Sequence, residues 1–152
     1  MDILVINGPN LGFLGQRQPD VYGSQGMDAL PDLVERLLGD GARRIRLTLF
    51  QSNGEGALID RLEEAWKSKT DGLVLNAGAY THTSLALADC LAWIKIPCVE
   101  VHLSNVHARA SAIRHQSLIA RHCIGAIAGF GIMSYALAVQ ALWQRLGSPE
   151  AA

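Results

Sequence analysis

The chain has 152 residues, of which 49% are hydrophobic, and its formal net charge is −1. This length suits one domain with a substantial buried core, and this composition is not that of a disordered chain. Because lysines and arginines are scattered and no apolar stretch is long enough for a membrane span, we expect neither a nucleic-acid partner nor a membrane partner.

The first residues and the cysteines predict a cellular location. The beginning, MDILVING, has no charged region followed by an apolar one, so we expect no signal peptide. The three cysteines, Cys90, Cys98 and Cys123, form no C-x-x-C pair, and we expect them to be reduced core residues. Together these features predict a cytoplasmic protein.

Short apolar runs alternate with helix-length segments along the chain. The expected strands, in chain order, are residues 3–7, 45–51, 72–76, 98–103 and 124–130. The expected helices are residues 27–38, 55–67, 83–94 and 132–146, and the last two are apolar enough for burial on two sides, as in an oligomer. This alternation predicts an α/β fold: a flavodoxin-like three-layer sandwich with a five-stranded parallel sheet of order 2-1-3-4-5. We expect residues 1–152 to form a single domain with a frayed tail at 147–152.

Polar segments follow three of the expected strands. NGPNLGFLGQRQPDVYG (7–23) comes after the first, AGAYTHTS (77–84) after the third and SNVHARASAIRHQS (104–117) after the fourth. Ligands of open parallel sheets bind beyond the carboxyl ends of the strands, and these three strands are neighbours in the expected order. We therefore expect the three segments to converge on one cleft.

The segment after the first strand has the length of a lid. Its spacing, NGPNLG, matches neither the dinucleotide fingerprint nor a phosphate-binding loop. It contains Arg17 and Tyr22. A tyrosine has a pKa of about 10, which a nearby arginine would lower, so this pair could supply a phenolate base. The alternative is that both are ordinary surface residues.

The segment after the third strand contains a histidine among hydroxyl side chains. Thr81, Thr83 or Ser84 could cap the following helix, whose first N–H groups could bind an anion or hydroxyl groups. Asp89 follows His82 by seven residues, which would place both on roughly one helical face. The alternatives are a structural histidine and a solvated or interface carboxylate.

The end of the fourth strand suggests acid–base chemistry. Glu100 and His102 alternate onto one face, and a carboxylate beside a histidine suits a general acid. Arg109 and Arg114 offer forked donors to a carboxylate ligand. A metal site is the rival interpretation, but His102 and His107 match no zinc motif, so we expect no metal. The sequence also contains no G-x-S-x-G elbow, which disfavours a serine hydrolase.

Several motifs together resemble those of one enzyme family. NGPNLGFLGQRQPDVYG, FQSNGEGALID, NAGAYTHTS, EVHLSNVHAR and IAGFG occur in the order found in type II 3-dehydroquinate dehydratase. The resemblance extends from Ile6 to about Leu142. It implies a flavodoxin-like catalytic domain that assembles as trimers into a dodecamer. It also implies dehydration of 3-dehydroquinate to 3-dehydroshikimate, in the shikimate pathway of aromatic amino acid biosynthesis or in quinate catabolism, with no metal or organic cofactor.

The resemblance also implies roles in catalysis. Tyr22 matches the general base, and Arg17 matches the residue that keeps that tyrosine ionised. Asn10 matches the residue that stabilises an enolate through a water molecule. His102 matches the general acid that protonates the departing hydroxyl, and Glu100 matches its orienting partner. No Schiff base is implied, and the lysines lie in polar or segment-ending contexts.

The substrate contacts implied by the resemblance come from three segments. Asn76 and His82 match residues that bind substrate hydroxyls, and Asp89 matches a carboxylate that reaches a neighbouring subunit's site. The remaining matches are Leu103 and Ser104, as backbone donors to the substrate carboxylate, and Arg114, at the substrate end of the cleft.

The chain departs from the family pattern at a few positions. The segment ASAIRHQS (110–117) is one residue longer and has Gln116 in place of a histidine, which bears on where Arg114 lies. Ala88 replaces an arginine and Trp93 a glutamate where subunit contacts are expected. Gly54 replaces a common histidine, and there we expect little consequence.

Two other function classes remain as alternatives. The altered 110–117 segment would fit a non-catalytic binding module for a small polyol acid, which would bind a substrate analogue without turnover. A flavin or nucleotide binder on the same architecture would show cofactor absorbance or bound phosphate, but the loop spacings disfavour it.

Overall fold

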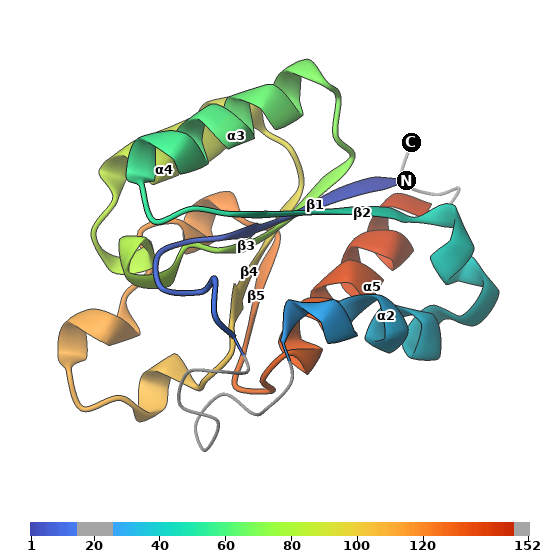
Figure 1. The fold of residues 1–152 in the computed structure, drawn as a ribbon. Coiled ribbons are helices and arrows are strands. Elements are labelled where there is room, and N and C mark those ends of the chain that lie inside the picture. Colours follow the sequence, from blue (N-terminus) through green and yellow to red (C-terminus); the bar gives the residue numbers. More distant parts are fainter. Residues whose placement is uncertain (15–25, 148–152) are drawn as a thin grey trace.

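The computed structural model describes residues 1–14 and 26–147 and contains one five-stranded parallel sheet (Figure 1). The strands are β1 (Asp2–Asn7), β2 (Arg46–Gln51), β3 (Gly72–Asn76), β4 (Cys98–His102) and β5 (Gly125–Ala128). Their order is β2-β1-β3-β4-β5, which confirms the expected order 2-1-3-4-5. Strands β1, β3 and β4, whose loops were expected to meet, are therefore adjacent.

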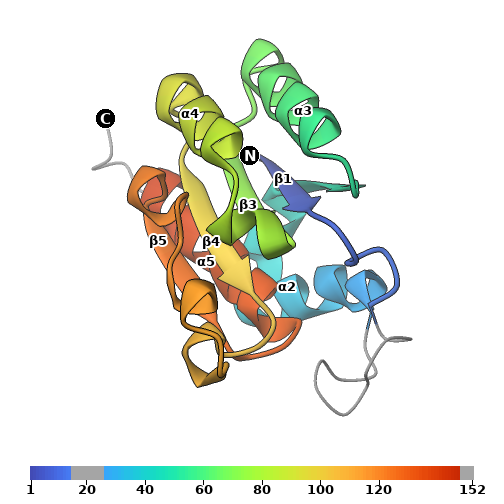
Figure 2. The same cartoon turned by 90° about the vertical axis from the view of Figure 1, so that its left-hand side faces the viewer.

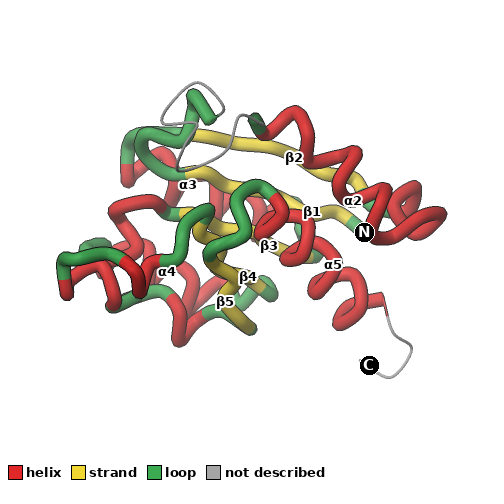
Figure 3. The backbone as a smooth tube through the Cα atoms, turned by 90° about the horizontal axis from the view of Figure 1, so that it is seen from below, coloured by secondary structure: helices red, strands yellow, loops and turns green. Residues whose placement is uncertain are grey.

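Two pairs of helices cover the two faces of the sheet. The pair α2 (Leu30–Leu38) and α5 (Met133–Gly147) covers one face, and the pair α3 (Glu55–Lys67) and α4 (Leu85–Ile94) covers the other (Figure 2). Seen from below, the α2 and α5 layer lies beside the strands (Figure 3). Alternation along β1 sends Ile3 and Val5 into the α2–α5 core, and Leu4 and Ile6 into the α3–α4 core. The resulting three layers confirm the predicted fold class.

Element boundaries differ from the expected ones where local chemistry ends an element. Strand β5 ends at Ala128, short of residue 130, because the next residue, Gly129, adopts a φ of 101°. Helix α4 begins at Leu85 because the Ser84 side chain accepts the Leu87 N–H at 2.9 Å, so Ser84 is the cap among the three candidates. Most of the expected frayed tail lies outside the described residues.

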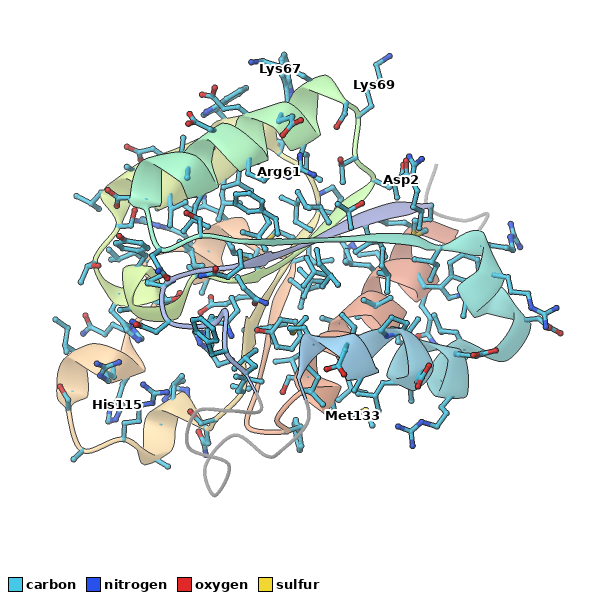
Figure 4. All side chains as sticks on the ribbon, viewed as in Figure 1. Asp2, Arg61, Lys67, Lys69, His115 and Met133 are labelled. Atoms are coloured by element: carbon cyan, nitrogen blue, oxygen red, sulfur yellow. The ribbon has the colours of Figure 1, made fainter. Side chains whose placement is uncertain are left out.

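The lysines and cysteines occupy ordinary structural positions. Lys67 and Lys69 point away from the protein, far from His115 (Figure 4), and Lys95 is also exposed. All three cysteines are free thiols, with Cys90 and Cys98 buried as expected and Cys123 half-buried. Within residues 1–14 and 26–147, no helix has the length and apolarity needed to cross a membrane.

Candidate active site

A cavity of about 230 Å³ lies at the carboxyl ends of β1, β3 and β4. All three polar segments contribute to it, which confirms that they converge. Its lining residues are Pro9, Asn10, Leu11, Leu14, Asn76, Gly78, Ala79, His82, His102, Leu103, Ser104, Val106, Arg109 and Arg114. Seven of the predicted site residues are in this set: Asn10, Asn76, His82, His102, Leu103, Ser104 and Arg114.

A hydrogen-bonded chain ends at His102. Glu100 and His102 share one face of β4, and the His102 Nε2 atom lies 2.6 Å from Oε1 of the buried Glu100. The other carboxylate oxygen, Oε2, accepts the Ser117 hydroxyl at 2.8 Å. An ionised carboxylate only accepts hydrogen bonds, so Nε2 of His102 carries the hydrogen. Nδ1 of His102 has no partner among the described residues, which leaves it for a ligand in the cavity.

The second histidine of the cavity is held by a different kind of group. Nδ1 of His82 lies 2.6 Å from the backbone carbonyl oxygen of Gln116. A carbonyl can only accept, so Nδ1 is protonated and Nε2 of a neutral His82 is an acceptor. The His82 and His102 rings are nearly parallel, at 11°, with centroids 6.4 Å apart. The cavity therefore has two imidazoles with distinct hydrogen-bonding roles.

Asn76 is fixed by a buried network beneath the cavity. Its Nδ2 donates to the Tyr135 hydroxyl at 2.7 Å, and that hydroxyl donates to Oδ1 of Asn7 at 2.7 Å. Oδ1 of Asn76 accepts the Gly78 N–H at 3.2 Å. Burial raises the pKa of Tyr135, which keeps this hydroxyl neutral as a donor. An amide has two N–H groups, so one remains on Asn76 for a ligand hydroxyl.

The loop after β1 reaches the cavity at a point where its backbone passes very close to the backbone that follows β3. Gly8 donates its N–H to the Asn76 carbonyl at 2.7 Å, and a Cβ at Gly8 would lie 2.4 Å from the Ala77 carbonyl oxygen. Asn10 adopts a left-handed φ of 66°, which asparagine tolerates well, and its N–H donates to Oδ1 of Asn53 at 3.0 Å. These contacts hold Asn10 at the cavity edge.

Two arginines, Arg109 and Arg114, are among the residues that line the cavity. Arg109 Nη2 donates to the Ser104 hydroxyl at 2.8 Å, and the Arg109 carbonyl lies 2.7 Å from Nε2 of His115. Arg114 also lines the cavity and lies in a short 3₁₀ helix, Ala112–His115. Two arginines in one lining make the cavity suited to an anionic ligand group.

Of the other four predicted site residues, Glu100 binds His102 without lining the cavity, and three are not placed at the cavity. Arg17 and Tyr22 lie outside the described residues. Asp89 is exposed on α4 and does not line the cavity. The expectation that it shares a helical face with His82 is wrong, because His82 ends a separate 3₁₀ helix (Gly78–His82) and Ser84 then caps α4.

The structure also adds residues that the sequence motifs did not indicate. Tyr135 binds Asn76 and is itself bound to Asn7. The Gln116 carbonyl binds His82, and the Ser117 hydroxyl binds Glu100, the partner of His102. Asn7, Gln116 and Ser117 belong to the polar segments 7–23 and 104–117, and Tyr135 is a large polar side chain in the apolar α5 segment, but no motif gives any of them a role. Within residues 1–14 and 26–147, no three His, Cys, Asp or Glu side chains gather as a potential metal site.

Comparisons with known proteins agree on one family. Residues 1–143 match the sequence family described as dehydroquinase class II. A 3-dehydroquinate dehydratase of Exiguobacterium sp. is 52% identical over 142 residues, covering 93% of this chain and 94% of that protein. The crystal structure of a type II dehydroquinase from Butyrivibrio crossotus superposes with a TM-score of 0.84 at 43% identity, covering 93% of this chain and 97% of the other. That of Propionibacterium acnes gives a TM-score of 0.82 at 36% identity, covering 94% and 96%. The family match, these identities and the shared fold all cover more than nine-tenths of the chain, which therefore belongs to the class II dehydroquinase family.

Proposed function

We propose that this chain dehydrates 3-dehydroquinate to 3-dehydroshikimate, a step of the shikimate pathway. The observation that carries the proposal is the buried Glu100–His102 pair, joined at 2.6 Å and placed at a cavity that also holds two guanidinium groups. The pair suits an acid that protonates a departing hydroxyl, and the guanidinium groups suit the substrate carboxylate.

In the proposed reaction, Tyr22 removes a proton alpha to the ketone, and Arg17 keeps that tyrosine ionised. Asn10 stabilises the enolate through a water molecule. The carbon–oxygen bond then breaks, and His102 gives its proton to the leaving hydroxyl, which departs as water. Because Nε2 of His102 donates its hydrogen bond to Glu100, the transferred proton comes from Nδ1. The negative charge of Glu100 balances the positive charge of the imidazolium.

The proposed substrate contacts follow from the same cavity. Asn76 offers its remaining amide hydrogen to a substrate hydroxyl, and Nε2 of His82 accepts from another. The backbone N–H groups of Leu103 and Ser104 bind the substrate carboxylate, near Arg114.

The exposed position of Asp89 is compatible with a reach into a neighbouring subunit's site. The proposal therefore includes a homo-oligomer in which trimers assemble into a dodecamer. It also includes a cytoplasmic location. No metal, organic cofactor or Schiff base takes part, and quinate catabolism is the alternative setting.

Turnover of 3-dehydroquinate by the purified protein tests the activity directly. The conjugated enone product should appear as rising ultraviolet absorbance, and borohydride with substrate should not inactivate the protein. Tyr22→Phe and His102→Ala should each lower kcat by several orders of magnitude. Binding of a substrate analogue without turnover would instead indicate the binding module, and a near-normal rate in either variant would contradict the role given to that residue.

A further inference from the structure

Ser117 occupies the outer end of the chain of hydrogen bonds that leads to His102. Its Oγ accepts the Ala120 N–H at 3.0 Å and lies 2.8 Å from Oε2 of Glu100. A hydroxyl has a single hydrogen, and the backbone N–H can only donate to Oγ, so the Ser117 hydrogen goes to the carboxylate. The direction of the bond is thereby fixed.

This hydrogen bond controls the orientation of the Glu100 carboxylate. Glu100 is 2% exposed, and each of its two oxygens has one partner, Ser117 on one side and His102 on the other. Without Ser117, Oε2 has no donor among the described residues and the carboxylate plane is no longer held from both ends. The position of Oε1, and with it the His102 ring, then becomes less defined.

The chain around Ser117 is itself anchored to the cavity. The preceding residue, Gln116, accepts from His82, and the following residue, Leu118, donates its N–H to the Thr81 carbonyl at 2.9 Å. Three consecutive residues therefore bind the loop after β3 and the carboxylate on β4. A side chain on such a segment is placed with little freedom.

We propose that Ser117 is a positioning residue for the dehydration: through Glu100, it holds His102 in the orientation that delivers a proton from Nδ1. The inference rests on the proposed function. Ser117 binds Glu100 and is not among the residues that line the cavity, so its effect should fall on the chemical step and not on substrate binding.

The test compares Ser117→Ala with two other variants. Ser117→Ala should lower kcat about tenfold while KM stays within about twofold, because a bond to a charged group is lost away from the substrate. Ser117→Thr keeps the hydroxyl and should restore most of the rate. Ser84→Ala is the matched control: Ser84 also accepts a backbone N–H three residues on, at 2.9 Å, but no hydrogen bond joins it to Glu100. It should lower thermal stability and leave kcat within about twofold.

A double-mutant cycle separates positioning from a general loss of structure. In a Glu100→Ala background, Ser117→Ala should lower kcat by less than a further factor of about two, because the carboxylate on which Ser117 acts is absent. A tenfold cost in both backgrounds, or no cost in the otherwise wild-type protein, would overturn the inference. An inactive wild-type protein would instead overturn the proposed function, so the two failures are distinguishable.

Discussion

Among the oxygen atoms beneath the cavity, the Tyr135 hydroxyl should contribute the most to the free energy of unfolding. Tyr135→Phe removes a group that bridges Asn7 and Asn76, both 3% exposed, at 2.7 Å to each. It leaves one buried acceptor and one buried donor unpaired, and each such group costs about 1–3 kcal/mol. Since Asn76 also lines the cavity, water can reach it and relieve part of this cost. We therefore expect a loss of about 2–4 kcal/mol in the free energy of unfolding.

Urea and thermal unfolding at one fixed protein concentration measure this loss. For a chain of this size the expected decrease in Tm is about 4–16 °C. The freed Asn76 amide can also rotate, so KM should rise more than kcat falls. Tyr80→Phe is the control, because its hydroxyl donates at 3.0 Å to the carbonyl of the exposed Asn53, and its loss should cost about 1 kcal/mol or less. A loss under about 0.5 kcal/mol for Tyr135→Phe, or equal losses for the two variants, would contradict this expectation.

Two further predictions concern close packing and a buried thiol. Gly8→Ala would place a Cβ 2.4 Å from the Ala77 carbonyl oxygen and should destabilise by about 1–3 kcal/mol, whereas Gly56→Ala, with nothing within 4 Å, should be neutral or stabilising in the same unfolding assay. Burial raises the pKa of Cys90 to about 11 from 9.0, so alkylation at pH 8, followed by mass mapping, should be about 100-fold slower than for an exposed thiol. Because the folded pKa is the higher one, stability contributed by Cys90 is present below about pH 9 and should decline as the pH rises toward 11. Rapid labelling of Cys90 in the folded protein would contradict this.

The central strands could be predicted because strands buried on both faces appear in the sequence as short apolar runs. GLVLN is buried at every position of β3, and CVEVH at every position of β4, as expected for the interior of a parallel sheet. The run IGAIAGF is a weaker signal, because it is rich in glycine and alanine, and β5 ends before Gly129, whose φ is positive. Periodicity also placed α3 at its observed bounds, since Leu58 and Leu62 bury one stripe.

The site was predictable only as far as its residues lie near strand ends. His102, Asn76 and Arg114 follow from topology, because adjacent parallel strands bring their loops together. Tyr135 could not be assigned in the same way, since its partners lie 59 and 128 residues away in the chain. Ser117 is 17 residues from Glu100, a separation with no local pattern. The spacing of His82 and Asp89 predicts one shared helical face, and this prediction is wrong. The two residues do not belong to one continuous α-helix, because a 3₁₀ helix ends at His82 and Ser84 then caps α4.

The two histidines show why partners matter more than residue type. Both line one cavity with nearly parallel rings, and either could be taken for the acid on proximity alone. His102 binds a carboxylate, which balances the charge of an imidazolium, whereas His82 binds a carbonyl, which fixes a tautomer without supplying a full charge. The group that must hold and release a proton is better served by the first environment, and the group that must accept a substrate hydroxyl by the second. The assignment of His102 as acid and His82 as acceptor therefore has support from their hydrogen-bond partners, independent of the family motifs.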